Sequence, residues 1–244
     1  MLNDQDFGLL QSSVDAMMER LASLRLNLIV ERDFARLLEF LRRMNSPTQN
    51  PTFDPAVNDL RNAGFWLRIV DGNGDTVASH AQRIFITADF HELLESGRIW
   101  YDKGMDLQPS QAPLQVQRSA TLISGVVAHA GGLFVNPVYR KKGLSMFLPF
   151  LSRSLCLRNY NTDFHTALVL ASMAGSRIPR ADYGYPHVEW CMRGWFPPTR
   201  RNEEDVHLCY MTRTETMERF RRLPEHPAFP ADAIAERLRQ AVGA

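Results

Sequence analysis

The sequence has few cysteines, no long apolar run and no excess of one charge. The three cysteines are odd in number and lack the spacing of a metal site, so we expect buried, reduced thiols and no metal. The longest weakly polar run, residues 122–135, contains His129 and is too short to span a bilayer. These absences argue against a disulfide-rich secreted domain and against a membrane-spanning protein.

The charges are balanced, with 28 Lys and Arg against 27 Asp and Glu and a net charge of +1. Nothing in this balance indicates nucleic acid or an anionic membrane as a partner. The first six residues are polar and acidic, unlike a signal peptide, and we expect a cytoplasmic protein. With 45% hydrophobic residues, the composition is typical of a globular protein.

The length of 244 residues fits one large domain or two small ones. We predict a helical extension over residues 1–24 and a single domain over residues 25–244. That domain carries a long insertion at 87–118 and a helical tail at 214–244, with one helix at 231–242.

Residues 5–23 show the spacing of a narrow apolar helical seam. Its members, three and four positions apart, are Phe7, Leu10, Val14, Met17, Leu21 and Leu24. The seam is shorter than the three to four heptads expected of a free-standing coiled coil. Docking on its own domain is the favoured interpretation, and a homodimer seam is the alternative.

Apolar patterns and turn residues predict the remaining elements. Strands are expected at residues 26–30, 65–70, 76–85, 119–135, 164–170, 188–196 and 206–212. Helices are expected after Asp33, which can cap one, and at residues 55–63, 89–97 and 172–185. Polar loops separate these elements at residues 45–55 and 197–205.

The stretch from Ala128 to Arg158 combines a strand, a basic glycine turn and a helix. The turn reads Arg140-Lys-Lys-Gly143-Leu-Ser145, and the helix after it has apolar residues at helical spacing. The first amides of a helix lack intrahelical partners, and the helix dipole is positive at that end. Gly143 lets a phosphate approach the backbone, so the pattern predicts an anion site. Pro149 predicts a kink one to two turns into the helix.

This stretch resembles the coenzyme A signature of the GNAT superfamily of N-acyltransferases. The signature is Gln or Arg, two residues, Gly, one residue, then Gly or Ala, after an apolar strand and often Pro-x-Tyr. Here Val135-Asn-Pro137-Val-Tyr139 precedes the turn, and Ser145 stands at the last small position. The resemblance covers roughly residues 25–213.

The resemblance implies a three-layer α+β fold with a mixed, mostly antiparallel central sheet between flanking helices. Two central strands splay apart in this family, here the strand ending at Val135 and the strand at 164–170. The pantetheine arm of an acyl-CoA, most simply acetyl-CoA, would pair with backbone near Phe134 and Val135. The implied residues for its pyrophosphate are Arg140, Lys141, Lys142, Gly143, Leu144 and Ser145.

The resemblance also implies an acid that protonates the leaving thiolate. Many members place a Tyr four residues before a Gly-Phe pair, but this sequence has Gly194-Trp195 with Trp190 at the matching position. Tyr183 and Tyr185 lie just upstream and are the candidate acids.

A base must accept the proton of the amine. His129 on the signature strand and Glu189 at the start of the last hairpin are the candidates. A lone histidine on a mainly apolar strand is more often a structural residue than a catalytic one.

The implied function is acyl transfer from acyl-CoA to a small-molecule or peptide amine by direct attack. The acceptor would lie between the loops at 45–55 and 197–205. One alternative is a GNAT-fold module that binds acyl-CoA without catalysis, which Trp190 favours. A remoter alternative is a phosphate site for another nucleotide.

Overall fold

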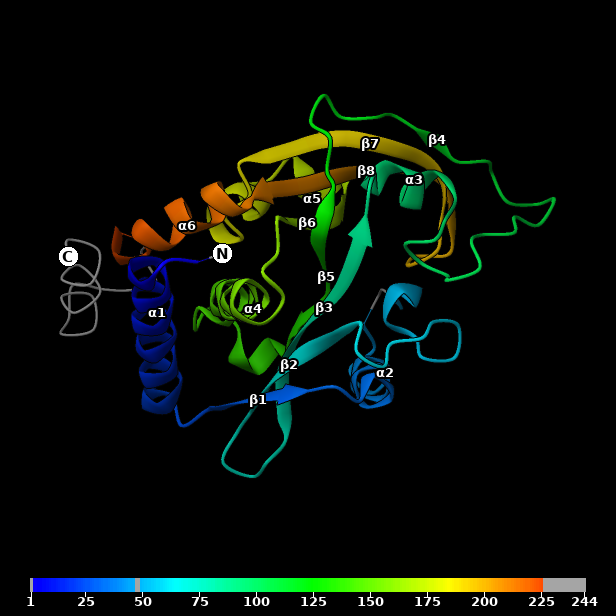
Figure 1. Ribbon diagram of the computed structural model, residues 1–244. Coiled ribbons are helices and arrows are strands. Elements are labelled where there is room, and N and C mark those ends of the chain that lie inside the picture. The colour runs from blue at the N-terminus through cyan, green and yellow to red at the C-terminus, as the bar shows by residue number, and fades with distance from the viewer. Residues whose placement is uncertain (1, 47–48, 226–244) are drawn as a thin grey trace.

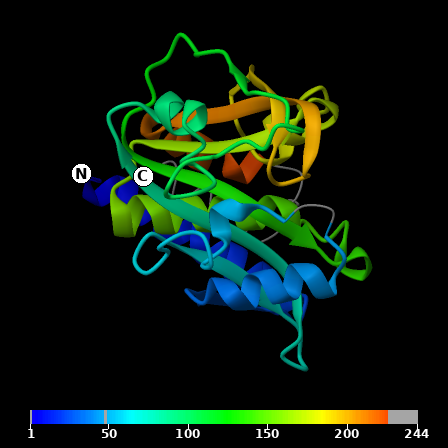
Figure 2. The ribbon, with the colours of Figure 1, turned by 90° about the vertical axis from the view of Figure 1, so that its right-hand side faces the viewer.

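The computed structural model describes residues 2–46 and 49–225, and the helix predicted at 231–242 lies outside them. One sheet of eight strands runs through the molecule in the order β1-β2-β3-β5-β6-β8-β7-β4 (Figures 1 and 2). The strands are β1 (Asn27–Glu31), β2 (Gly64–Val70), β3 (Thr76–Thr87), β4 (Gln115–Val116), β5 (Gly125–Val135), β6 (Phe164–Leu170), β7 (His187–Phe196) and β8 (Arg201–Thr212).

Every pair of neighbouring strands in this sheet is antiparallel except β5 and β6, which run parallel. A parallel pair needs a crossover, and the helix α4 (Leu144–Tyr160) supplies it. The mixed, mostly antiparallel sheet predicted from the sequence is therefore confirmed.

Helices lie on both faces of the sheet and complete three layers (Figure 1). One face carries α1 (Asp4–Ser23), α4 and α6 (Arg213–Arg221), and the other carries α2 (Phe34–Arg43) and α3 (Phe90–Glu95). The largest apolar cluster lies under α1 and α4, and two further clusters lie under α2 and α3. The arrangement leaves the central strands buried and makes their ends the accessible places.

The N-terminal helix packs against its own chain. Leu10, Met17 and Leu21 are fully buried in the cluster that α4 and α6 share. Phe7, at the far end of the seam, stays 47% exposed, and the Arg158 guanidinium lies 4.7 Å from its ring. The seam therefore packs on its own domain, as the favoured interpretation expects.

The helix after Asp33 forms as predicted, but the helix predicted at residues 55–63 is wrong. The Asp33 carboxylate caps α2 by accepting from the Ala35 amide at 3.0 Å. Residues 51–53 form one 3₁₀ turn, and Nδ2 of the Asn58 side chain donates to the carbonyls of Pro51 and Trp100. The hydrogen bond to Trp100 joins this segment to a distant part of the chain, and the local sequence could not indicate that contact.

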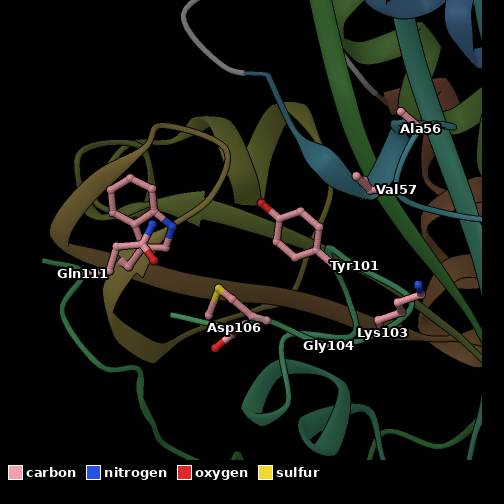
Figure 3. A pocket seen from close by; sticks show the side chains of 9 residues that line it. Ala56, Val57, Tyr101, Lys103, Gly104, Asp106 and Gln111 are labelled. Atoms are coloured by element: carbon pink, nitrogen blue, oxygen red, sulfur yellow. The ribbon is translucent and has the colours of Figure 1, made fainter. Parts of the chain in front are cut away.

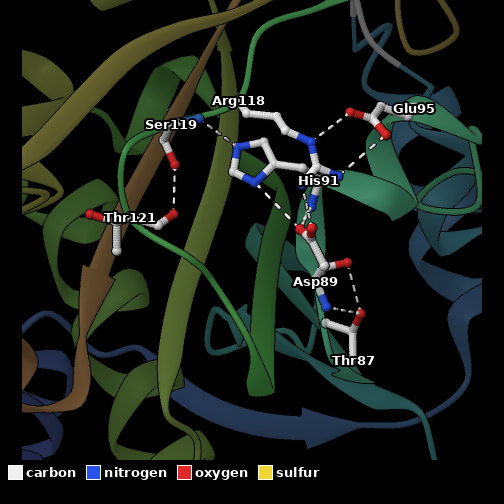
Figure 4. A network of polar contacts seen from close by, with 7 residues as sticks. All are labelled: Thr87, Asp89, His91, Glu95, Arg118, Ser119 and Thr121. Carbon is white, nitrogen blue, oxygen red and sulfur yellow. Dashed lines mark hydrogen bonds and ion pairs between the residues drawn. The ribbon is translucent and has the colours of Figure 1, made fainter.

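The two ends of the insertion at 87–118 are joined by a polar network (Figure 4). Asp89 caps α3 and pairs with Arg118, which also donates to Glu95 at 3.0 Å. The Ser119 amide donates to Nε2 of the buried His91 at 3.1 Å. The insertion is therefore held as a wall beside the sheet.

Several predicted boundaries change. Residues 201–205 belong to β8, where Asp205 pairs with Arg193, so the loop predicted at 197–205 is a turn over 197–200. Residues 119–124 are not a strand, and the helix predicted at 172–185 is two short turns, α5 (Ala171–Ala174) and Ile178–Asp182. Polar side chains hide the strand pattern at residues 201–205, and Pro179 interrupts the predicted helix.

Met17→Asp should lower the free energy of unfolding by about 3 kcal/mol or more, because a charge would enter a fully buried apolar contact. Urea denaturation measures this change. Gly8→Asp is the matched control, because the site is exposed with nothing within 4 Å of an added Cβ. Equal stability of the two variants would contradict the packing of α1.

Candidate active site

The parallel strands β5 and β6 separate after a short common stretch. They pair over only four positions, from Val127 opposite Phe164 to Ala130 opposite Ala167. Beyond them β6 stays paired with β8, and β5 stays paired with β3. The edge of β5 that faces β6 is therefore unpaired from residue 131 onward.

A β-bulge at Gly131-Gly132 accompanies the separation. Ala81 of β3 pairs with Gly131 while Ser79 pairs with Phe134, so β5 carries one extra residue. Gly132 adopts a φ of 58°, and its carbonyl accepts a hydrogen bond from the Ser79 hydroxyl at 2.8 Å. A bulge of this kind bends its strand and raises the local twist, which directs β5 away from β6.

Gly131 is needed for a different reason. A Cβ built on it would lie 2.4 Å from the Phe53 ring, which rests on the strand. The loop that carries Phe53 also reaches the far hairpin, where the Gln49 amide donates to the Pro198 carbonyl at 3.1 Å. The two loops that the sequence predicts as acceptor walls thus meet above the gap.

A cavity of about 230 Å³ lies between the separated strands. Its lining comes from both faces of the sheet: Asn50, His80, Trp100, His129–Leu133, Pro149, Ala167–Leu170, Ser172, Met173, Tyr183, Tyr185, Phe196 and Pro198. Most of these groups are apolar, and the titratable ones are two histidines and two tyrosines. The cavity thus joins the α4 side of the sheet to the insertion side.

The basic turn stands where β5 leads into α4. Gly143 is the N-cap residue of α4 with a φ of 81°, a left-handed conformation that favours glycine, and no side chain caps this helix. None of the amides of residues 141–145 donates to another described group. The unengaged amides at the start of α4 can accept an anion, because the first amides of a helix lack intrahelical partners.

The side chains of the turn leave this geometry positive. Arg140, Lys141 and Lys142 are exposed, and no carboxylate of the described residues pairs with them. The Lys142 ammonium lies 5.0 Å from the Tyr139 ring, and the Tyr139 hydroxyl donates to Asp71 at 3.0 Å. Tyr139 thereby ties the turn to the β2–β3 hairpin. The helix that follows is continuous through Pro149.

Both predicted tyrosines line the cavity. Tyr185 is buried at 2% exposure, and Tyr183 is partly buried beside it. Burial raises the pKa of Tyr185, while the nearby Arg153 opposes that rise, and burial raises the pKa of Tyr183 to about 12. Both phenols therefore hold their protons at neutral pH.

Arg153 is a buried cation behind the cavity wall. Its guanidinium carbon lies 4.4 Å from the Tyr185 ring centre, and its Nη1 donates to the Tyr183 carbonyl at 2.6 Å. The residue is 2% exposed and pairs with no carboxylate among the described residues. It positions both tyrosines and adds positive potential next to them.

His129 also lines the cavity, on the insertion side. Its Nδ1 lies 3.0 Å from the Thr166 hydroxyl, and the Phe90 ring is 5.8 Å away. Burial, together with nearby Arg83, lowers the pKa of His129 to about 3. A neutral imidazole with so low a pKa is a weak base.

Glu189 and Trp190 lie outside the cavity. The Glu189 carboxylate accepts from the Tyr210 hydroxyl at 2.8 Å, and the Trp190 indole donates to Asp205 at 3.1 Å. Neither residue is among those that line the cavity. The structure therefore does not bring Glu189 together with the tyrosines or with His129.

Sequence reasoning missed Trp100 and Phe196 among the residues that shape the cavity. Asn50 also lines it and lies in the loop predicted as an acceptor wall, and His80, on another predicted strand, ranks below His129 as a candidate base. Burial, with Arg153 nearby, lowers the pKa of His80 to about 3. Trp100 and Phe196 meet edge to face with ring centres 6.0 Å apart. Trp100 lies in the insertion at 87–118, where two adjacent aromatic residues, Trp100 and Tyr101, could have indicated a binding surface.

A second hollow of about 410 Å³ is separate from the cavity that Trp100 and Phe196 line (Figure 3). Tyr101 and Trp195, the sequence neighbours of Trp100 and Phe196, line it together with Lys103 and Asp106. Since both signs of charge are present, this hollow selects neither anions nor cations.

The described residues include no group of three or more histidine, cysteine, aspartate or glutamate side chains placed to hold a metal. None of the described helices is long and apolar enough to cross a membrane.

No protein-family model and no curated relative matches the chain. Among solved structures, NAA60 of Arabidopsis thaliana with acetyl-CoA has a TM-score of 0.48 at 13% identity, covering 77% of this chain and 99% of that one. The ribosomal-protein-S5-alanine acetyltransferase of Vibrio fischeri has a TM-score of 0.48 at 12% identity, covering 77% of this chain and 93% of that one.

The spermidine N-acetyltransferase of Vibrio cholerae with CoA and spermine has a TM-score of 0.45 at 10% identity, covering 79% of this chain and 98% of that one. With TM-scores below 0.5, these similarities say nothing about the activity of this chain.

Buried neutral histidines predict that stability falls with acid. The folded pKa of His129 is about 3, below the ordinary 6.5, so the unfolded state binds the proton more readily. This contribution to stability is full above pH 6.5 and is lost as pH falls, at up to about 1.4 kcal/mol per pH unit.

Urea denaturation between about pH 7.5 and pH 5.5 measures this slope. His129→Gln should make it shallower than in the parent, since one such histidine is gone. An unchanged slope would contradict the low pKa.

Proposed function

We propose that this protein is a GNAT-type N-acyltransferase that moves an acyl group, most simply acetyl, from acyl-CoA to a primary amine. The observation that carries the proposal is the unpaired edge of β5. Residues 131–133 of this strand line the cavity that also holds two tyrosines, and the chain leads from the end of the strand to the unengaged amides of residues 141–145.

The turn would hold the pyrophosphate of the acyl-CoA. Its amides point to no other described group, and three exposed cations surround them. Backbone donors with fixed positions bind phosphate oxygens without further ordering, and the dipole of α4 adds to the attraction. Gly143 would leave room for the phosphates because it carries no Cβ.

The unpaired edge of β5 would hold the pantetheine arm. Phe134 and Val135 bond to β3 on one side, and β6 has separated from their other side. Amides of the arm can take the place of a strand at such an edge. This binding directs the thioester into the cavity, where proximity to the amine lowers the barrier.

Tyr185 would protonate the leaving sulfur. It lines the cavity in its protonated form, and Arg153 against its ring keeps the pKa from rising as far as burial alone would take it. Tyr183, whose pKa burial raises to about 12, is the second candidate. His129, as a weak base, is better suited to lining the acceptor side than to removing a proton.

A binding module without catalysis is the second candidate function. Trp190 at the usual tyrosine position favours it, whereas the two cavity tyrosines favour an enzyme. Release of CoA from acetyl-CoA with a panel of amines separates the two, because a binding module would bind CoA and release none.

Gly143→Glu should abolish CoA binding in calorimetry, because it places a bulky anion where phosphate would lie. Gly74→Glu is the matched control, since Gly74 has a φ of 82° and open space around it. Both variants carry the same backbone strain and charge, so only the position differs. Unchanged affinity of folded Gly143→Glu would refute the phosphate site.

Tyr185→Phe should lower turnover by about tenfold to a thousandfold, the scale of lost acid catalysis, with CoA affinity nearly unchanged. Tyr210→Phe is the control, because its hydroxyl bonds Glu189 outside the cavity. Normal turnover of Tyr185→Phe with impaired Tyr183→Phe would make Tyr183 the acid. Normal turnover of both would leave protonation to solvent.

A further inference from the structure

Among the described residues that line the cavity, none could neutralise a positively charged acceptor. None of the described residues that line it is an aspartate or a glutamate. An alkylammonium that entered would lose hydration without gaining an ion pair, which costs several kcal/mol in an apolar site. The lining therefore selects against amines that are protonated at neutral pH.

Buried arginines increase this selection from both sides. Arg83 of β3 lies opposite His129 of β5 in the strand register and is 4% exposed. Arg153 lies against the ring of Tyr185. Asp102 balances Arg83, but its side chain is 41% exposed and lies outside the cavity, and no described carboxylate balances Arg153. Positive charge near an amine favours its neutral form.

The volume limits the size of the reacting end. About 230 Å³ must hold the acyl thioester as well as the amine, and sites for drug-sized ligands begin at about 300 Å³. The rings of Trp100 and Phe196 bound the insertion side, where aromatic side chains favour a flat apolar partner.

On the basis of the proposed function, we infer that the acceptor is a small, apolar, weakly basic amine that is neutral at physiological pH, of the aromatic amine class. The observation that carries this is an apolar cavity that two buried arginines flank and whose described lining contains no carboxylate.

The chemistry of a neutral amine needs no separate base. The nitrogen lone pair attacks the thioester carbonyl, the carbon–nitrogen bond forms, and the carbon–sulfur bond breaks. One proton leaves the nitrogen and one reaches the sulfur, so the protons balance, with Tyr185 able to relay the transfer. An ammonium would first have to lose an additional proton, for which the cavity offers only weakly basic histidines.

The isomers 4-methylaniline and benzylamine test this inference, because they contain the same atoms but only benzylamine is charged at neutral pH. In the full chain saturated with CoA, calorimetry should show at least tenfold tighter binding of 4-methylaniline. Turnover with acetyl-CoA should show the same preference in kcat/KM, and spermidine should rank last.

Asn50→Asp introduces a carboxylate with little change of shape. Asn50 lines the cavity, and its Oδ1 accepts from the Thr52 amide, a capping role that aspartate retains. The variant should shift the ratio of the two affinities toward benzylamine by about tenfold. Asn3→Asp is the matched control, since Asn3 caps α1 in the same way far from the cavity and should shift nothing.

If benzylamine or spermidine binds and reacts as well as 4-methylaniline while CoA binds normally, the inference fails and the proposed function stands. If neither isomer binds, or if Asn50→Asp leaves the ratio unchanged, the inference is likewise overturned. Loss of CoA binding in the parent chain would overturn the proposed function and this inference together.

Discussion

The extra residue at Gly131-Gly132 is the constraint on which the site depends. It bends β5 after four paired positions, so β5 and β6 cannot close the centre of the sheet. The same bend leaves one edge of β5 without hydrogen bonds and opens a cavity between layers that otherwise pack tightly. Without the bulge, the basic turn would still precede α4, but no unpaired strand edge would connect it with a cavity.

The electrostatics of the cavity follow from burial more than from charge pairing. Arg153 has no described carboxylate partner and is held by a carbonyl and by aromatic rings. Burial is the main reason that the pKa values of His80 and His129 are low, and the fields of Arg153 at His80 and of Arg83 at His129 add to it. The surface turn is cationic, and the described lining of the cavity contains no aspartate or glutamate, so both places suit anionic or neutral ligands.

The insertion and the loop around Asn50 form one wall. Asn58 bonds Trp100, Asp102 pairs with Arg83, and the network at His91 closes the insertion on itself. The wall therefore depends on polar contacts between segments about forty residues apart. These contacts fix the position of Trp100 at the aromatic side of the cavity.

By itself, the sequence determined the features that a few neighbouring residues encode: the cap at Asp33, the strand Phe164–Leu170 and the basic turn at Gly143. Helical spacing and local hydrogen bonds act within one or two turns, so a short stretch suffices. Only the tertiary structure decided that Tyr183 and Tyr185 line the cavity while Glu189 faces Tyr210. The side of the sheet that Glu189 faces depends on the register of β7, because a shift of one residue moves a side chain to the opposite face. The two tyrosines precede that strand, and their positions depend on the contacts with Arg153 of α4.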